Sequence, residues 1–107
     1  MFDIMRSMTM VDHDKAAELA EIFHLLGDPN RLRLVCVCLD EAVSVQMLAE
    51  RLGLSASLTS HHLRLLRAAR LVRGERDGKR VFYRAADAHV RDMLTAMIDH
   101  IDEEADS

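Results

Sequence analysis

Hydrophobic residues recur with helical spacing through the first third of the chain. Residues 14–26 place Ala, Leu, Ile and Phe at intervals of three and four, and Gly27 follows as a stop signal. Residues 28–39 begin with Asp-Pro, a typical helix start, and their apolar residues leave almost no polar face. We therefore predict two helices, the second largely buried, and expect residues 1–13 to form a loose tail.

Two further helical periods lie in residues 44–72 and are interrupted at the sequence LGLS. Gly53 is placed to end the first of these helices, and Ser55 or Ser57 can cap the second. This spacing predicts a helix, a tight turn and another helix.

The pattern then changes from helical spacing to alternation. In residues 71–85, apolar positions alternate with charged ones around Asp77-Gly78, which indicates a β-hairpin. From Asp87 onward the helical spacing returns. The chain is thus expected to form one domain over residues 1–107, mainly α (α+β), with four helices, a hairpin and a C-terminal helix. A helix-turn-helix followed by a basic hairpin is the winged helix-turn-helix arrangement.

Charge is distributed unevenly, although the formal net charge is only −4. Residues 61–84 hold eight Lys or Arg against two acidic residues, whereas residues 87–107 hold seven acidic residues against one Arg. This asymmetry indicates polyanion binding in the first segment and cation binding in the second.

The second helix of the predicted pair carries residue types that suit DNA. Its exposed side is expected to offer short hydrogen-bonding groups for base edges and phosphates, then cations, while the wing tip supplies cations for phosphates. The expected DNA-binding residues are Ser55, Ser57, Thr59, Ser60, His61, His62, Arg64, Arg76, Lys79 and Arg80. Read one residue at a time, the hydroxyls could equally be caps and the arginines a solvated face.

The C-terminal helix carries two pairs of potential metal ligands. Asp87 and His89 form a D-x-H pair at its start, and His100 and Glu103 form an H-x-x-E pair near its end. Nitrogen and carboxylate oxygen donors suit Zn(II) and, less selectively, Co(II) or Ni(II). The two histidines are 11 residues apart, about 16 Å along a helix, so one helix cannot bring the pairs together.

Two copies of this helix packed antiparallel would bring the two ligand pairs together. The first pair of one chain would then lie beside the second pair of the other, with Asp87 as the N-cap. The expected dimer seam consists of Val90, Met93, Leu94, Met97 and Ile101. The alternative is a surface helix with scattered histidines in an acidic tail, and spacing alone does not decide between them.

From about residue 17 to 104 the chain resembles the ArsR/SmtB family of dimeric winged-helix metal-sensing repressors, and most closely its zinc and cobalt sensors. The resemblance is carried by LLGDPNRLRL, LAERLGLSASLTSHHLRLLRAARLV, RDGKRVFYR and DAHVRDMLTAMIDH. It implies a cytoplasmic homodimer, residues 87–104 as its dimerisation and metal-binding helix, and Asp87, His89, His100 and Glu103 as intersubunit Zn(II) ligands, with Co(II), Ni(II) or Cd(II) as alternatives.

The resemblance also implies a mechanism. The metal-free dimer would hold double-stranded operator DNA with an imperfect inverted repeat, and Zn(II) binding would release it, derepressing genes for metal efflux or sequestration. His100 would use its other ring nitrogen to bond the backbone near Arg70, after the recognition helix.

Cys36 and Cys38 are the only cysteines, and their sequence VCVC superficially matches the Cys-x-Cys metal box of arsenic and cadmium or lead sensors in the family. Aligned on Leu48-Ala49, the box positions are instead Ser44, Gln46 and Met47, none of which supplies a thiolate. Residues two apart on a helix also point about 200° apart. We expect core packing, with redox, persulfide or arsenite sensing as the alternative. His13 and His24 are expected to be solvated.

The remaining observations limit the alternatives. No segment approaches the ~20 apolar residues of a membrane span, so no membrane partner is expected. No nucleophile-base pair or glycine-rich phosphate loop is present, so we do not expect an enzyme. One rival outside DNA binding remains, a dimeric interaction module whose basic hairpin contacts an acidic partner.

Overall fold

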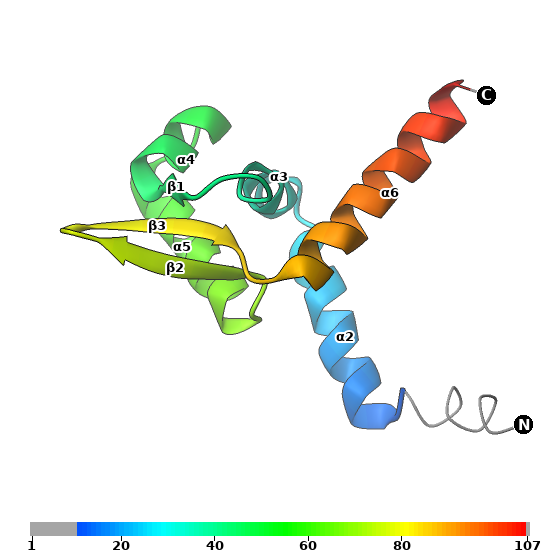
Figure 1. Cartoon of the computed structure of the whole chain (residues 1–107). Helices are drawn as coiled ribbons and strands as arrows, with labels where there is room; N and C mark the ends of the chain where they lie inside the picture. Colours follow the sequence, from blue (N-terminus) through cyan, green and yellow to red (C-terminus); the bar gives the residue numbers. More distant parts are fainter. Residues whose placement is uncertain (1–10, 107) are drawn as a thin grey trace, which may run out of the picture.

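A computed structural model describes residues 11–106, with side chains described up to residue 103. The tail expected over residues 1–10 lies outside the described residues, and His13 is not loose but is the first residue of a helix. The elements are α2 (His13–Leu26), α3 (Pro29–Val37), β1 (Val43–Ser44), α4 (Val45–Leu52), α5 (Ala56–Ala68), β2 (Val72–Asp77), β3 (Arg80–Ala85) and α6 (Ala88–Asp106). The predicted order of helices and hairpin is confirmed, and the fold is a winged helix-turn-helix (Figure 1).

Each described helix starts at a short polar side chain that accepts a hydrogen bond from the backbone N–H three residues later. These caps satisfy donors that have no partner within the helix, which is why the helix starts could be located in the sequence. The pairs are Asp12 with Lys15, Asp28 with Arg31, Ser44 with Met47, Ser55 with Leu58, and Asp87 with Val90.

The three strands form one antiparallel sheet in the order β1-β3-β2. Asp77 pairs with Arg80, so the hairpin turns at Gly78 and Lys79, and Gly78 adopts the positive φ of 66° that this tight turn requires. Strand β1 is absent from the sequence prediction. It places Val43 opposite Tyr83 and fastens the base of the hairpin to the body.

The core lies beneath the helix-turn-helix pair. Leu34, Leu48 and Leu66 come from α3, α4 and α5 and are fully buried, together with Val43 and Val72 from the sheet. The prediction that α3 is largely buried holds only in part, because Leu34 and Val35 are inaccessible, whereas Pro29 and Arg33 are exposed and the other residues are half-buried. The hydrophobic core therefore fixes α5 against the body and leaves its opposite side free.

Helices α2 and α6 extend away from this body (Figure 1). In α2 only Leu25 and Leu26 are buried, whereas Phe23 is 55% exposed. In α6 the last described hydrophobic side chain, Ile101, is 63% exposed. Among the described residues, no helix combines the length and the apolar character needed to cross a membrane.

Candidate nucleic-acid interface and metal-ligand helix

The solvent side of α5 carries hydroxyl groups at its start and cations further along. Ser55 is the N-cap, with its hydroxyl engaged by Leu58 N–H, and Ser57 is exposed in the first turn. His61 and Arg64 are exposed one and two turns later, and Ser60 is half-buried. This side of the helix presents groups that can bind base edges and phosphates.

Thr59 and His62 do not belong to that surface, so the expectation that they lie on the exposed side is wrong. Thr59 is fully buried, and its hydroxyl donates to Ser55 O at 2.8 Å. His62 is 6% exposed and its Nδ1 has no hydrogen-bond partner. The signal was present in the sequence, because both share the i, i+3, i+4, i+7 stripe with Leu63 and Leu66.

Burial also determines the charge of His62. Its pKa lies below the usual value chiefly because the buried ring is desolvated, with Arg31 and His61 adding to the effect and the Asp28 carboxylate opposing it. His62 is therefore a neutral packing residue at pH 7.

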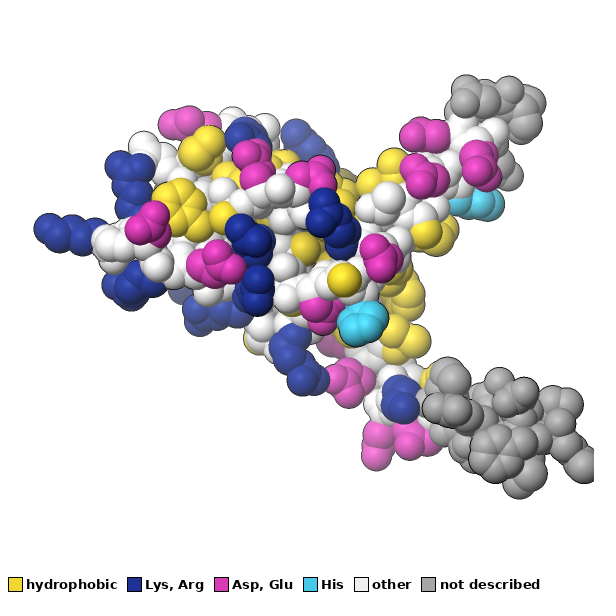
Figure 2. All heavy atoms as spheres, in the orientation of Figure 1, with side chains coloured by type: hydrophobic (Ala, Val, Ile, Leu, Met, Phe, Trp, Pro, Cys, Tyr) yellow, Lys and Arg dark blue, Asp and Glu magenta, His cyan; other side chains and the backbone are white. Residues whose placement is uncertain are grey.

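The hairpin supplies cations at its tip. Nearer the base, Arg73 and Arg84 both lie 3.3 Å from the Glu75 carboxylate. In the part of the chain described here, no acidic group lies within ion-pair distance of Arg76, Lys79 or Arg80. Figure 2 shows Lys and Arg side chains around the end of the hairpin. These side chains are free to contact phosphates.

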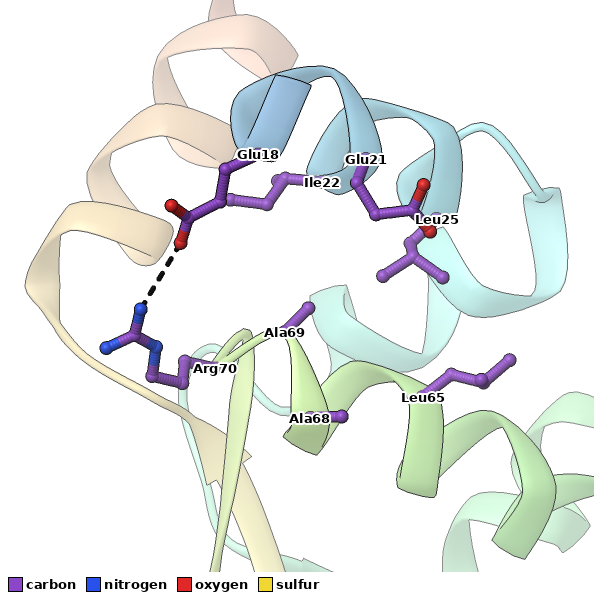
Figure 3. A pocket seen from close by; sticks show the side chains of 8 residues that line it. All are labelled: Glu18, Glu21, Ile22, Leu25, Leu65, Ala68, Ala69 and Arg70. Carbon is purple, nitrogen blue, oxygen red and sulfur yellow. Dashed lines mark hydrogen bonds and ion pairs between the residues drawn. The ribbon is translucent and has the colours of Figure 1, made fainter. Parts of the chain in front are cut away.

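The end of α5 is closed by an unusual turn. Arg70 adopts φ +60°, and Leu71 N–H donates to Leu66 O at 2.9 Å, a left-handed helix ending that usually contains glycine. The Arg70 guanidinium lies 3.3 Å from Glu18 on α2. Figure 3 shows this pair at one end of a hollow of about 380 Å³ between α2 and the end of α5. The turn thus links the recognition helix to α2.

At the start of α6 the first expected ligand pair is close together. Asp87 precedes the helix and caps it, since its Oδ1 accepts from Val90 N–H at 3.1 Å. His89 Nδ1 lies 3.6 Å from the same oxygen, and the His89 side chain is 96% exposed. The Val90 N–H bond, with His89 adding to it, lowers the pKa of Asp87 below its ordinary value. The carboxylate is therefore ionised at neutral pH, as a metal ligand must be.

His100 and Glu103 lie on the exposed outer part of α6. Within one protomer, the described residues contain no cluster of three or more His, Cys, Asp or Glu side chains suited to a metal ion. The structure therefore brings Asp87 and His89 together but leaves both remote from the second pair, as the 11-residue separation requires. The donor types would suit Zn(II), but within the described part of one chain only two of the candidate donors lie at each end of α6.

The apolar residues of α6 divide into two groups. Val90 and Leu94 pack into the protomer's own core, so the expectation that they belong to a dimer seam is wrong. Met93 is half-buried against that core. Met97, Ile98 and Ile101 remain exposed, at 52%, 42% and 63% respectively. Figure 2 shows hydrophobic side chains on the side of the molecule from which α2 and α6 project.

The cysteines occupy different environments. Cys38 is fully buried, which confirms core packing for this residue, and desolvation raises its pKa to about 12, with Arg51 opposing and Glu41 reinforcing the shift. Cys36 is half-buried, and burial raises its pKa as well. Neither environment favours a thiolate. His24 is exposed on α2, as expected.

Comparison with known proteins places this geometry in context. Residues 28–73 match the family model described as "Bacterial regulatory protein, arsR family". The transcriptional repressor SmtB homolog of Synechocystis sp. is 41% identical over 90 residues, covering 84% of this chain and 68% of that protein. The HTH-type transcriptional regulator KmtR of Mycobacterium tuberculosis is 41% identical over 81 residues, covering 76% of this chain and 62% of that protein.

A solved structure agrees with these matches. The homodimeric winged helix-turn-helix DNA-binding domain Mb0332 of Mycobacterium bovis superimposes with a TM-score of 0.75 at 26% identity, covering 88% of this chain and 89% of that one. Sequence, fold and basic recognition helix agree: the chain belongs to the ArsR/SmtB family of DNA-binding winged helix-turn-helix transcriptional regulators.

Proposed function

We propose that the protein is a homodimeric, metal-responsive transcriptional repressor. The metal-free dimer binds an operator with an imperfect inverted repeat, and Zn(II) binding releases it, which derepresses genes for metal efflux or sequestration. Each dimer holds two equivalent sites, formed by Asp87 and His89 of one subunit with His100 and Glu103 of the partner subunit.

The single observation that carries this proposal is the arrangement of α6. Its two ligand pairs are exposed and too far apart to share an ion within one chain. The apolar residues between them include Met97, Ile98 and Ile101, which no described part of the protomer buries. An antiparallel pair of α6 helices would cover these side chains and place the two ligand pairs side by side.

The DNA interface follows from α5 and the wing. Ser57, Ser60, His61 and Arg64 on α5 contact base edges and phosphates, and Arg76, Lys79 and Arg80 on the wing bind the backbone. Thr59 and His62 hold the helix in place instead, because they are buried, and Ser55 caps the helix with a hydroxyl that remains exposed. A second copy of α5 in the dimer would bind the second half-site.

Regulation is proposed to run from α6 to the end of α5. Bound Zn(II) would tie the two α6 helices together through all four ligands. His100 donates through its other ring nitrogen to the backbone near Arg70, which fixes the imidazole and stabilises a dimer that fits the two half-sites poorly. By linkage, the factor by which zinc weakens DNA binding equals the factor by which DNA weakens zinc binding.

The test is a titration of the operator-bound dimer with Zn(II), Co(II), Ni(II), Cd(II) and arsenite, with DNA release followed by fluorescence anisotropy. We expect release by Zn(II) and, because nitrogen and oxygen donors do not distinguish these ions strictly, by some of the other divalent metals. Arsenite should have no effect. Release by arsenite alone would contradict the proposal.

Substitution of one ligand separates sensing from DNA binding. His100→Ala should abolish zinc-induced release while leaving the operator affinity of the metal-free dimer unchanged. His24→Ala removes an equally exposed imidazole from α2 and is the matched control. If Cys36→Ser and Cys38→Ser together remove the response and His100→Ala does not, the cysteines are the sensor.

The cysteine alternative has less support. Cys38 is inaccessible and keeps its proton at neutral pH, because burial raises its pKa to about 12. A thiol that reacts with an oxidant or a soft metal needs thiolate character and access.

A further inference from the structure

A hollow of about 240 Å³ with charged walls lies between the α3–β1 connection, the base of the hairpin and the start of α6. Its walls include Asp40, Asp87 and Arg91. Arg91 extends from the first turns of α6 to Asp40, where its guanidinium nitrogen donates to Oδ1 at 2.6 Å. This ion pair joins residues 51 positions apart in the chain. Asp87, one of the proposed metal ligands, thus lines the same hollow as the ion pair.

A second carboxylate lies in the same hollow as Arg91. Asp87 lines this hollow too, and its backbone oxygen accepts from Arg91 N–H at 3.4 Å, which holds the two residues close together at the start of α6. A guanidinium can bind a carboxylate through two parallel hydrogen bonds. Without Asp40, Arg91 could turn to the Asp87 carboxylate, the same group that the proposed site uses as a ligand.

We propose that Asp40 is a positioning residue that holds Arg91 away from Asp87 and so keeps the Asp87 carboxylate available to the metal. The inference rests on the proposed metal site of α6 and concerns how tightly that site binds.

The physical reason is competition between two cations for one carboxylate. A divalent ion at Asp87 repels the Arg91 guanidinium, and Asp40 pairs with this guanidinium outside the site. In the absence of Asp40, binding of the metal has to displace Arg91 first. Arg91 is 51% and Asp87 54% exposed, so solvent weakens the competing Arg91–Asp87 pair and the effect is modest.

The experiment measures the zinc affinity of the full-length dimer by competition with a chromogenic chelator. Asp40→Ala should weaken zinc binding by about two- to fivefold, the range expected when an exposed ion pair must be broken. Arg91→Gln removes the competitor and should bind zinc at least as tightly as the wild type. The double variant should match Arg91→Gln, because Asp40 has nothing left to hold.

The matched control is Glu41→Ala. Glu41 is adjacent to Asp40 and lines the same hollow, but its carboxylate pairs with Arg51 at 2.6 Å. Glu41→Ala should leave the zinc affinity unchanged, whereas Asp40→Glu should bind zinc with the wild-type affinity. The Asp40→Ala effect should also shrink in high salt, since salt screens the Arg91–Asp87 attraction. A fold-stabilising role for the Asp40–Arg91 pair would instead make Arg91→Gln weaken zinc binding as well.

Three results would overturn the inference. If Asp40→Ala weakens zinc binding equally with and without Arg91, Asp40 acts directly on the metal through its own charge. If Asp40→Ala has no effect while His100→Ala abolishes binding, the metal site stands and the positioning role does not. Zinc affinity that is unaffected by His100→Ala would instead reject the α6 site, and this inference with it.

Discussion

Helices α5 and α6 both carry histidines and apolar stripes, but the two stripes are buried to different extents within the protomer. The stripe of α5, from Thr59 to Leu66, is buried along its length. The stripe of α6 is buried only at Val90 and Leu94, and hydrophobic side chains are exposed from Met97 onward. One helix therefore completes its packing within a chain, whereas the other leaves apolar surface exposed.

This difference in burial indicates the kind of partner that each helix is suited to bind. The outer face of α5 is mainly polar and cationic, although Leu58 is 41% exposed, and it offers the hydrogen bonds and charge that nucleic acid requires. The exposed face of α6 is apolar and flanked by carboxylates and an imidazole, which suits another copy of the protein and a metal ion. Nucleic acid would bind to a helix whose packing is already complete within one protomer. A second copy of the chain would instead cover apolar side chains that one protomer leaves exposed.

The largest expected effect concerns α5, whose apolar stripe is buried within the protomer. Leu66 is fully buried, and Leu66→Ala should lower the free energy of unfolding by about 2–5 kcal/mol through lost burial and the cavity left behind. Met97→Ala is the matched control, because Met97 is 52% exposed and contributes little within a protomer. Urea denaturation at a protein concentration below the dimer dissociation constant measures both, so that the proposed α6 seam does not contribute. Comparable losses would break the proposed contrast between α5 and α6.

The next prediction concerns α6, whose outer apolar side chains are exposed in the protomer. Ile101→Asp places a charge in the proposed α6 seam and should weaken dimerisation by about 10- to 100-fold, since an unpaired polar group buried there costs roughly 1–3 kcal/mol. Analytical ultracentrifugation over a concentration series measures the dissociation constant. The fold of each protomer should be retained, because Ile101 is 63% exposed. An unchanged dimer would place the interface elsewhere.

The wing provides a smaller effect on the nucleic-acid side. Arg76→Gln or Lys79→Gln should reduce the slope of log operator affinity against log salt by about one unit each, since each removes one phosphate contact. Arg73→Gln is the comparison, because Arg73 already pairs with Glu75 at 3.3 Å. A salt-insensitive complex would favour the rival interaction module.

Arg70→Gly should stabilise the protein by about 0.5–1 kcal/mol. Its left-handed backbone, at φ +60°, costs a non-glycine residue roughly 1–2 kcal/mol, part of which is offset because glycine is more flexible when unfolded. The lost ion pair with Glu18 contributes little, because both side chains are mostly exposed. Thermal unfolding measures the gain. A loss of stability would mean that the Glu18 contact outweighs the strain.

The mildest effect is a pH dependence from His62. Because the folded state lowers the pKa of His62 below its ordinary value of 6.5, the unfolded chain takes up the proton first as pH falls. The contribution of His62 to stability is therefore present above pH 6.5 and is lost as the pH falls through the lower, folded pKa. His62→Gln should flatten this part of the stability curve, with His61→Gln as the control. A slope that persists would have to come from another group.

Much of the fold could be predicted because its signals are local. Asp28, Ser44, Ser55 and Asp87 cap the helices whose starts they indicate, and Gly78 takes up the turn conformation of the hairpin. Strand β1 could not be found, because two residues contain no periodicity and its pairing with β3 joins positions about 40 residues apart. Such pairing depends on tertiary structure and has no local signature.

The site residues were harder to assign than the elements that carry them. Thr59 and His62 have polar side chains, which suggested the DNA side, but their helical phase places them with Leu63 and Leu66. For Val90 and Leu94 the sequence showed an apolar stripe without indicating whether the protomer or its partner covers it. The Asp40–Arg91 pair, 51 residues apart, requires the folded chain to be recognised at all.

The junction between β3 and α6 limits how this protein can vary in evolution. Only Ala86 and Asp87 separate the hairpin from α6, and the backbone there is held by hydrogen bonds from Ala85 N–H to Cys38 O and from Ala86 N–H to Leu71 O. Inserting one residue would turn all of α6 by about 100° relative to the body. Lengthening the tip of the hairpin would leave the orientation of α6 unchanged, whereas a change of length in this two-residue connection would not.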